Sequence, residues 1–232
     1  TINTSHPKSI LLLVTSRKTV DHGTSASHIQ TIHLHQLAKM PGSSLWLLPP
    51  PTHPLHTLLP TLISQTSSHF HSPHRFLPHI TLTSEISASS YSSDPQAWLD
   101  ALHLPSTDGV VITFQQLASE DVFVRKLYVQ CAKTAGVRDL ARVCRQEVEG
   151  FGEEEVAKGW AEQQYNPHLS LLYHDCPVVT ETELSRVEGM AMQLGVDVHG
   201  HGELGGWKGG KVVLVPTDQP IAQWKPIAER HL

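Results

Sequence analysis

Two short stretches of the chain, PHITL and PHLSL, carry side chains that could move protons and bind a phosphate group. Each stretch places a histidine two positions before a hydroxyl residue: His79 before Thr81, and His168 before Ser170. Successive side chains of a β-strand point to opposite faces, so both members of each pair would share one face. The apolar residue between them would then face a core.

These four side chains suit an in-line displacement at phosphorus. One neutral imidazole could accept the proton of an attacking water, while an imidazolium protonates the leaving oxygen. The hydroxyls could donate hydrogen bonds to the non-bridging oxygens, whose negative charge rises in the transition state. We therefore predict His79 and His168 as catalytic residues and Thr81 and Ser170 as phosphate-binding residues, with no metal and no other cofactor.

The bare spacing is a weak signal in a chain with 17 histidines, because it occurs a third time at His22 and Thr24. The longer pattern Pro-His-apolar-Ser/Thr-Leu occurs twice, each time on a predicted strand that precedes an acidic helix start. The two copies are separated by about half the length of the chain that follows Met40. We infer a weakly preserved duplication of a strand–helix–strand unit.

The elements that must position these residues follow in order after Met40. Asp94 and Pro95 are predicted as the N-cap and first residue of a short helix. Strands are predicted over SLWLLPP, HITLTSEI, GVVITFQQLA, KLYVQCA, HLSLLYHD and GKVVLVP, and the main helices over PLHTLLPTLISQTSSHF, GVRDLARVCRQEVEGF, EEEVAKGWAEQ and ETELSRVEGMAMQLG. The predicted class is α+β, with two antiparallel sheets that face a central cleft and helices on their outer faces.

The domain boundary is expected near Met40, with one domain over residues 40–232. Residues 1–39 are rich in Ser, Thr and His, contain one acidic residue and show no sustained periodicity. We expect this leader to be disordered or a translated upstream extension. The alternative is a mitochondrial presequence, which the basic residues and many hydroxyls fit loosely.

Composition excludes several classes of protein. The net charge of −5 provides no basic stripe for long nucleic acids. Three scattered cysteines indicate neither a disulfide framework nor a zinc site, and they favour a reducing compartment. No apolar run is long enough for a membrane span. These features favour a cytoplasmic monomer that acts on a small molecule.

Histidine clusters and a glycine-rich segment invite other readings. Zinc needs three or four convergent ligands, and the histidines at 33 and 35, at 69, 71 and 74, and at 199 and 201 are better read as solvated surface residues. The segment GVDVHGHGELGGWKGGK lacks the order of a phosphate-binding loop. We expect it to be a hairpin connection near the cleft, which could serve as a lid.

Because it contains both motifs, the sequence resembles the 2H phosphoesterase superfamily, and within it the fungal and plant cyclic phosphodiesterases. The resemblance extends from about Leu45 to the C-terminus and includes LWLLPP, FLPHITLTS, NPHLSLLY and the segment KLYVQCAK…LARVCRQE. It implies a bilobal fold with a pseudo-two-fold axis. It also implies hydrolysis of nucleoside 2′,3′-cyclic phosphates to 2′-phosphates and of ADP-ribose 1″,2″-cyclic phosphate to ADP-ribose 1″-phosphate, linked to by-products of tRNA splicing.

Two further residues come from this resemblance. Trp46 matches an aromatic residue in the first strand of the family and could stack on a base, although a core tryptophan is an equal alternative. Tyr173 follows the second motif and would lie near the substrate. Simple alternation places Tyr173 on the core face, so this position requires a strand end or a β-bulge.

Other functional classes stay open at this point. An RNA-end-processing or 2′-5′ RNA ligase-like enzyme would need basic residues near the motifs, where only Arg75 is available. A non-catalytic nucleotide-binding module would be favoured by a degenerate motif, yet both motifs are intact. The family also implies a Golgi location as an alternative to the cytoplasm. The sequence does not distinguish the catalytic base from the catalytic acid.

Overall fold

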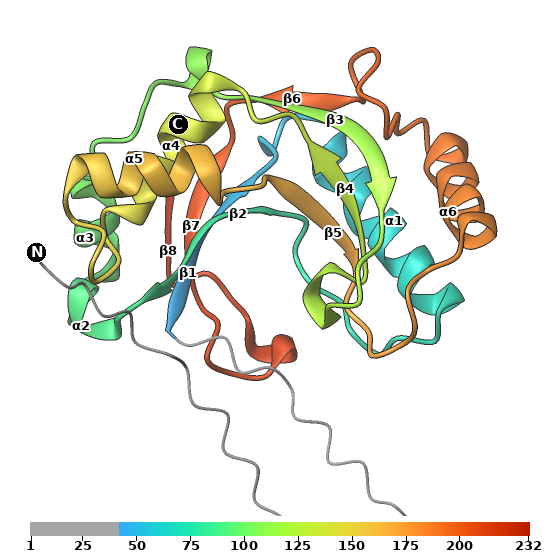
Figure 1. Ribbon diagram of the computed structural model, residues 1–232, viewed down its shortest axis with the longest axis horizontal. Coiled ribbons are helices and arrows are strands. Elements are labelled where there is room, and N and C mark those ends of the chain that lie inside the picture. Colours follow the sequence, from blue (N-terminus) through green and yellow to red (C-terminus); the bar gives the residue numbers. More distant parts are fainter. Residues whose placement is uncertain (1–41) are drawn as a thin grey trace, which may run out of the picture. The chain divides into compact units, whose positions relative to one another are not determined.

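An eight-stranded antiparallel sheet forms the centre of the part of the chain that the structure describes (Figure 1). The structure is a computed structural model that describes residues 42–232, so the predictions for the leader lie outside the described residues. The strand order is β6-β3-β4-β5-β2-β1-β7-β8. The strands are β1 (Ser43–Leu48), β2 (Ile80–Ile86), β3 (Val111–Ala118), β4 (Leu127–Cys131), β5 (His168–Leu172), β6 (Gly206–Lys208), β7 (Lys211–Pro216) and β8 (Ala228–His231).

The sheet has two halves, β6-β3-β4-β5 and β2-β1-β7-β8, which meet where β2 lies beside β5. The register between these two strands is set by one pair, Ile80 with Leu169, which we call the junction pair. The sequence predicted two separate sheets, whereas the pairing joins all eight strands in one. The difference has a simple cause: alternation of apolar and polar residues identifies a strand but does not say which distant strand it pairs with.

Helices cover one face of this curled sheet (Figure 1). Helix α1 packs against β5 and α6, helix α4 packs against β2 and α5, and α3 packs against β8. The predicted cap of α3 is confirmed, since the Asp94 carboxylate accepts a hydrogen bond from the backbone N–H of Ala97 at 2.9 Å and Pro95 is the first helical residue. The helices are α1 (Leu55–His69), α2 (Ala88–Tyr91), α3 (Pro95–Ala101), α4 (Ala135–Arg145), α5 (Glu154–Gln163) and α6 (Glu181–Gln193).

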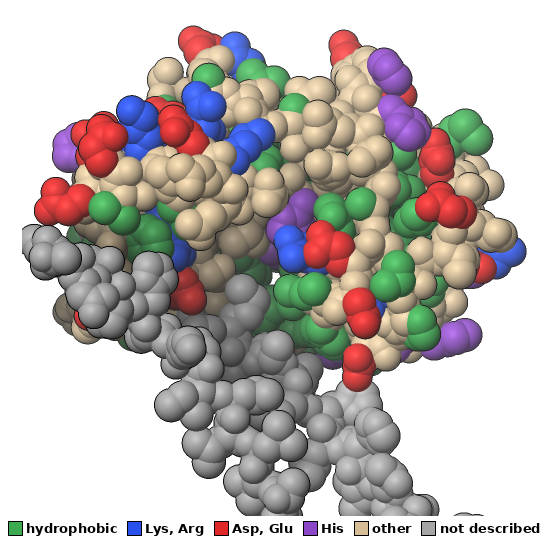
Figure 2. Space-filling view, viewed as in Figure 1, with side chains coloured by type: hydrophobic (Ala, Val, Ile, Leu, Met, Phe, Trp, Pro, Cys, Tyr) green, Lys and Arg blue, Asp and Glu red, His purple; other side chains and the backbone are tan. Residues whose placement is uncertain are grey.

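The molecule is hollowed near the centre of the face seen in Figure 2. Histidine, basic and acidic side chains gather around this hollow (Figure 2). Apolar side chains on the same view lie close to them. Small-molecule sites are concave and combine apolar side chains with a few polar groups, so this hollow is a candidate site.

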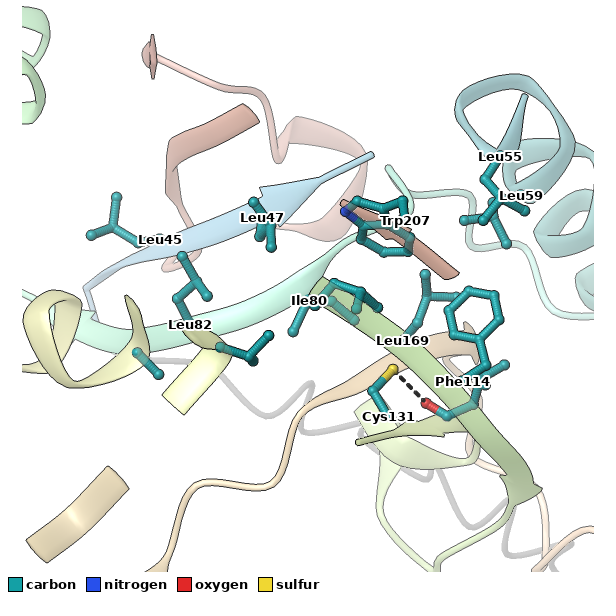
Figure 3. Close-up of a cluster of buried hydrophobic side chains, with 14 of the residues drawn as sticks. Leu45, Leu47, Leu55, Leu59, Ile80, Leu82, Phe114, Cys131, Leu169 and Trp207 are labelled. Atoms are coloured by element: carbon teal, nitrogen blue, oxygen red, sulfur yellow. Dashed lines mark hydrogen bonds between the residues drawn. The ribbon is translucent and has the colours of Figure 1, made fainter. Parts of the chain in front are cut away.

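The hydrophobic core lies between the sheet and the helices (Figure 3). The residues of the two motifs that were predicted to face a core do so: Ile80, Leu82, Leu169 and Leu171 are all fully buried in it. A second, smaller cluster lies on the other face of the sheet and consists of Trp46, Leu48, Val213 and Val215. Because alternate residues of β1 belong to different clusters, the alternation along this strand fixes which side chains turn toward the site.

The glycine-rich segment differs from its predicted position. It contains β6, which pairs with β3 at one edge of the sheet, whereas the two motif strands lie in the centre. The helix predicted to end near Gly150 ends at Arg145 instead. Within residues 42–232, no helix is both long and apolar enough to cross a membrane.

Candidate active site

The junction pair brings the two histidine motifs together. In an antiparallel pair, the residues that flank a register pair lie opposite each other. His79 therefore lies across from Ser170, and Thr81 lies across from His168. Since the junction pair faces the core, these four side chains turn to the opposite face of the sheet.

One pocket of about 220 Å³ contains every side chain that the sequence predicted for the site. The predicted residues in its lining are Trp46, His79, Thr81, His168, Ser170 and Tyr173. The other residues of the lining are Ser44, Ser84, Val124, Arg125, Thr217 and Trp224. Both halves of the sheet contribute to this pocket, so the site exists only where the halves meet.

The two imidazoles are oriented in the same way. The Nδ1 atom of His79 lies 2.6 Å from the carbonyl oxygen of Leu77, and that of His168 lies 2.9 Å from the carbonyl oxygen of Asn166. A carbonyl oxygen accepts only, so in each ring Nδ1–H is the donor and Nε2 keeps its lone pair. Each motif thus presents an Nε2 atom that can accept a proton.

Both imidazoles favour the neutral form. Burial lowers the pKa of His79 to about 4, and the charge of His168 lowers it too. Burial also lowers the pKa of His168, with a smaller contribution from the guanidinium of Arg125 and an opposing one from Glu120. Because each ring disfavours a charge on the other, a singly protonated pair is favoured over a doubly protonated one.

Trp46 lies directly against the first histidine. Its ring stacks on the imidazole of His79 with centroids 3.7 Å apart and planes 11° apart. The side chain of Trp46 is only 2% exposed, so it offers little free surface to a base. What the geometry shows is a tryptophan that holds an imidazole ring in place.

Tyr173 reaches the pocket because β5 is irregular at its end. Leu127 of β4 pairs with Leu172, whereas its neighbour Tyr128 pairs with Ser170, so β5 has one extra residue between these pairs. The extra residue is a β-bulge, and the strand ends one residue later. As a result, the hydroxyl of Tyr173 lies 3.5 Å from Nε2 of His79 instead of in the core.

The two motif hydroxyls are held differently. The Ser170 hydroxyl donates a 2.8 Å hydrogen bond to the backbone carbonyl of Val124. Thr81 is partly exposed, and its hydroxyl makes no hydrogen bond with another residue of the described range. Thr81 is thus ready to donate to a bound anion, whereas Ser170 would have to exchange one acceptor for another.

Arg125 is a site residue that sequence reasoning missed. It comes from the turn between β3 and β4, and its guanidinium forms a 2.7 Å ion pair with Glu120. The other carboxylate oxygen of Glu120 accepts a 2.7 Å hydrogen bond from the Tyr128 hydroxyl. The ring of Tyr128 meets that of His168 edge to face, with ring centroids 5.3 Å apart. No basic residue lies near His168 in the sequence, so only the fold of the turn could reveal this cation.

Two of the three histidine clusters outside the motifs lie in the part of the chain that the structure describes. Within residues 42–232, no group of three or more His, Cys, Asp or Glu side chains could hold a metal ion. His71, His199 and His201 are exposed, as predicted for solvated residues, whereas His69 and His74 are partly buried. The first cluster, at 33 and 35, lies outside the described residues.

Comparison with known proteins identifies the family of the chain. The family model for cyclic phosphodiesterase-like proteins matches residues 40–232. The chain belongs to this family.

Three fungal proteins, each named 2′,3′-cyclic-nucleotide 3′-phosphodiesterase, are similar to the chain. The protein of Phaeosphaeria nodorum is 62% identical over 193 residues, which are 83% of this chain and 100% of that protein. The protein of Neurospora crassa is 40% identical over 215 residues, with the same coverage of each chain. The protein of Yarrowia lipolytica is 29% identical over 219 residues, 82% of this chain and 99% of that protein.

Proposed function

We propose that the chain hydrolyses nucleoside 2′,3′-cyclic phosphates to nucleoside 2′-phosphates without a metal. The observation that supports this most strongly is the pair of imidazoles in one pocket, each with Nδ1 bonded to a backbone carbonyl and Nε2 available. The names of the fungal relatives support the same activity. His79 and His168 are the proposed catalytic residues.

The reaction needs one base and one acid, and the two rings can supply both. One neutral Nε2 accepts a proton from water as the water oxygen bonds to phosphorus. The other ring, as an imidazolium, donates its proton to O3′ as the P–O3′ bond breaks. The product carries a phosphate on O2′ and a hydroxyl at C3′, and proton exchange with solvent restores the starting pair.

The phosphate charge is compensated by donors around the pocket. Thr81 and Ser170 are the proposed donors to the non-bridging oxygens, whose charge increases in the transition state. Arg125 adds a positive charge at the pocket wall, and its guanidinium has donors beyond the one that it shares with Glu120. The bound anion would also raise the pKa of whichever imidazole acts as the acid.

We extend the proposal in three respects that follow the family resemblance. ADP-ribose 1″,2″-cyclic phosphate is a second substrate, and the physiological source of substrates is tRNA splicing. The two halves of the sheet, each with one motif strand at the junction, correspond to the two lobes of a bilobal fold with a pseudo-two-fold axis. The protein acts as a monomer on small molecules.

The direct test is to incubate the protein with each of the four nucleoside 2′,3′-cyclic phosphates and with ADP-ribose 1″,2″-cyclic phosphate. Phosphorus NMR identifies the product, and parallel samples contain EDTA. We expect nucleoside 2′-phosphates from the four nucleotides, ADP-ribose 1″-phosphate from the ADP-ribose substrate, and equal rates with the chelator. A 3′-phosphate product, or activity that chelation abolishes and zinc or manganese restores, would contradict the mechanism.

Matched variants show whether the proposed residues carry the activity. His168→Ala should lower kcat by about 10²–10⁴-fold, because it removes a proton-transfer group. His79→Asn should have a similar effect, although its side-chain N–H can still reach the carbonyl of Leu77. Thr81→Ala should lower kcat by about 10²–10³-fold with little change in KM, as expected for a donor that acts in the transition state. Near-full activity in either histidine variant would make that residue structural.

A further inference from the structure

Three aromatic side chains line the pocket, and only one of them has free surface. Trp46 is 2% exposed and Tyr173 is 4% exposed. One ring face of each is also occupied, that of Trp46 by His79 and that of Tyr173 by Phe76, with ring centroids 3.7 and 3.8 Å apart. Trp224 is partly exposed and has no parallel ring partner among the described residues.

The position of the Trp224 ring is fixed on three sides. Its indole N–H donates a 2.7 Å hydrogen bond to the backbone carbonyl of Gln219. Trp46 contacts it edge to face, with centroids 5.9 Å apart and planes at 65°, and Tyr173 does so at 6.0 Å and 73°. Contacts of this kind hold the plane of a ring, so a planar ligand would find a preformed surface.

Trp224 also lies beside the reaction centre. It lines the same pocket as His79, and Trp46 connects the two, since its ring stacks on the imidazole and contacts Trp224. A nucleoside cyclic phosphate with its phosphorus between the two histidines has one planar, uncharged part, the base. Of the pocket aromatics, Trp224 alone offers surface to such a group.

We propose that Trp224 forms the base subsite of the pocket and that the nucleobase of the substrate stacks on its indole ring. This rests on the proposed function, and it moves the base contact from Trp46 to Trp224. Every base has a π-face, so this contact favours a base over none but discriminates weakly among the four.

The experiment compares a nucleotide with a substrate that lacks the base. The two probes are adenosine 2′,3′-cyclic phosphate and methyl β-ribofuranoside 2,3-cyclic phosphate, which has a methoxy group in place of adenine. The wild-type protein should prefer the nucleotide in kcat/KM by about 5- to 150-fold, the range for one base stacked on an aromatic side chain. Trp224→Ala should abolish most of this preference through a higher KM for the nucleotide, with the base-free probe unaffected. Trp224→Phe should keep part of it.

Trp98→Ala is the matched control, because Trp98 is also a partly exposed tryptophan but lies on α3 and does not line the pocket. It should keep the wild-type preference. Equal losses on both probes in Trp224→Ala, or an unchanged preference, would overturn the base subsite.

If the wild-type protein cleaves neither probe, the proposed function itself fails. Binding of adenosine 2′-phosphate to wild type and Trp224→Ala, measured by calorimetry, would then still test the stacking contact: equal affinity would overturn it.

Discussion

The two histidines have the same hydrogen bond at Nδ1 but different surroundings. His79 is 5% exposed and lies between Trp46 and Tyr173, whereas His168 is partly exposed and lies near the ion pair of Arg125 and Glu120. Burial without a carboxylate partner makes a charge on His79 costly. A ring held neutral in this way can accept a proton, and it also makes the stability of the protein depend on pH.

We predict that acid lowers the free energy of unfolding through His79. Its folded pKa is about 4 and its ordinary value is 6.5, so the unfolded chain binds a proton first as the pH falls. The contribution of neutral His79 to the free energy of unfolding is therefore fully present above about pH 6.5 and is lost as the pH falls from about 6.5 to 4. The loss is on the order of 3 kcal/mol, because each pKa unit corresponds to about 1.4 kcal/mol. His168 adds a loss of the same sign.

Urea unfolding at pH 7 and pH 4.5 measures this loss, and His79→Asn is the matched variant. Asparagine has no titrating group, so the difference between the two pH values should shrink by about 2 kcal/mol or more in the variant. His71→Asn, at an exposed position, should leave the difference unchanged. An equal pH dependence in wild type and His79→Asn would show that His79 is not held neutral by the fold.

The site residues that the sequence predicted lie in a recognisable strand pattern, whereas the site residues that it missed do not. The motif residues could be predicted because alternation along a strand places a histidine and a hydroxyl on one face. Arg125 and Trp224 have no such signal, since each comes from a turn whose path depends on the whole fold. Turn residues enter a pocket through tertiary structure, which local pattern does not encode.

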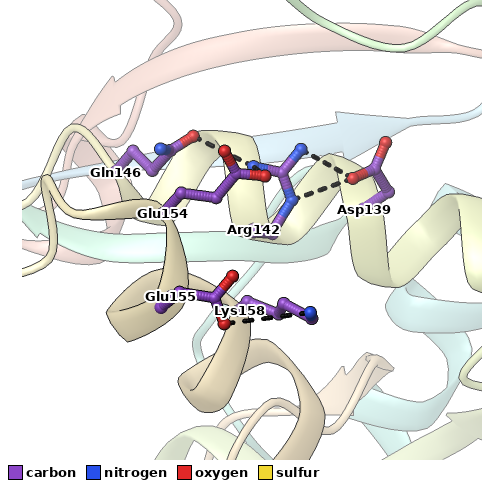
Figure 4. Close-up of polar contacts among 6 residues, drawn as sticks. All are labelled: Asp139, Arg142, Gln146, Glu154, Glu155 and Lys158. Atoms are coloured by element: carbon purple, nitrogen blue, oxygen red, sulfur yellow. Dashed lines mark hydrogen bonds and ion pairs between the residues drawn. The ribbon is translucent and has the colours of Figure 1, made fainter.

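Side-chain contacts hold helix α4 on both of its sides. Figure 4 shows Arg142 of α4 bonded to Asp139 and Gln146, with an ion pair to Glu154 of α5. On the side that faces the sheet, the buried Arg145 lies over the ring of Phe151 at 3.8 Å. It is this second arginine that connects α4 to a motif strand.

Arg145 holds the irregular end of β2. It donates to the hydroxyl of Thr83 at 3.3 Å and to the carbonyl of Ser84 at 3.4 Å, and it forms a 3.2 Å ion pair with Glu85. The register between β1 and β2 shifts in this region, and Glu85 has a φ of 70°, which is uncommon for a residue other than glycine. Arg145 thus stabilises a bulge four residues beyond Thr81.

We predict that Arg145→Ala lowers the free energy of unfolding by about 2–4 kcal/mol, because it opens a cavity beside Phe151 and leaves the Thr83 hydroxyl without its donor. Arg145→Met keeps most of the stem and should lose less. The control is Glu85→Gln, which removes the exposed partner of the ion pair and should cost about 1 kcal/mol or less. Urea unfolding measures all three, and an Arg145→Ala protein as stable as the control would show that the bulge does not depend on this arginine.

Strand and helix existence was largely predictable, but irregularities were not. The alternating segments became strands and Asp94 caps its helix as predicted. For Tyr173, the sequence showed that a strand end or a bulge was required, without showing where. The structure has both, and the extra residue is Leu171, between Ser170 and Leu172, where an ordinary apolar side chain gives no local sign of a bulge.

For the whole molecule, the site depends on the contact between the two sheet halves. One junction pair joins β2 to β5, and each half contributes one histidine and one hydroxyl to the pocket. Sequence reasoning predicted that the motifs would face each other but placed them on separate sheets. Pairing between strands 89 positions apart, from His79 to His168, is a long-range feature that single-sequence patterns do not specify.

The last prediction concerns the part of the chain that is sufficient for folding and activity. In the sequence, the first buried residue of the hydrophobic core is Leu45 and the last is Ala228. The family match covers residues 40–232. A chain that begins at Met40 therefore contains every described contact of the core and the pocket. We expect it to melt within about 2 °C of the full chain, equivalent to less than about 1 kcal/mol for a protein of this size, with unchanged kcat and KM.

A chain that begins at Pro49 is the matched control, because it also lacks β1, which pairs with both β2 and β7. Removing a central strand exposes two edges of the sheet and deletes Trp46, so this shorter chain should not fold cooperatively. Differential scanning calorimetry and the cyclic-phosphate assay compare the two. A melting temperature more than about 4 °C lower for the chain that begins at Met40 would mean that residues 1–39 stabilise the domain by 1 kcal/mol or more.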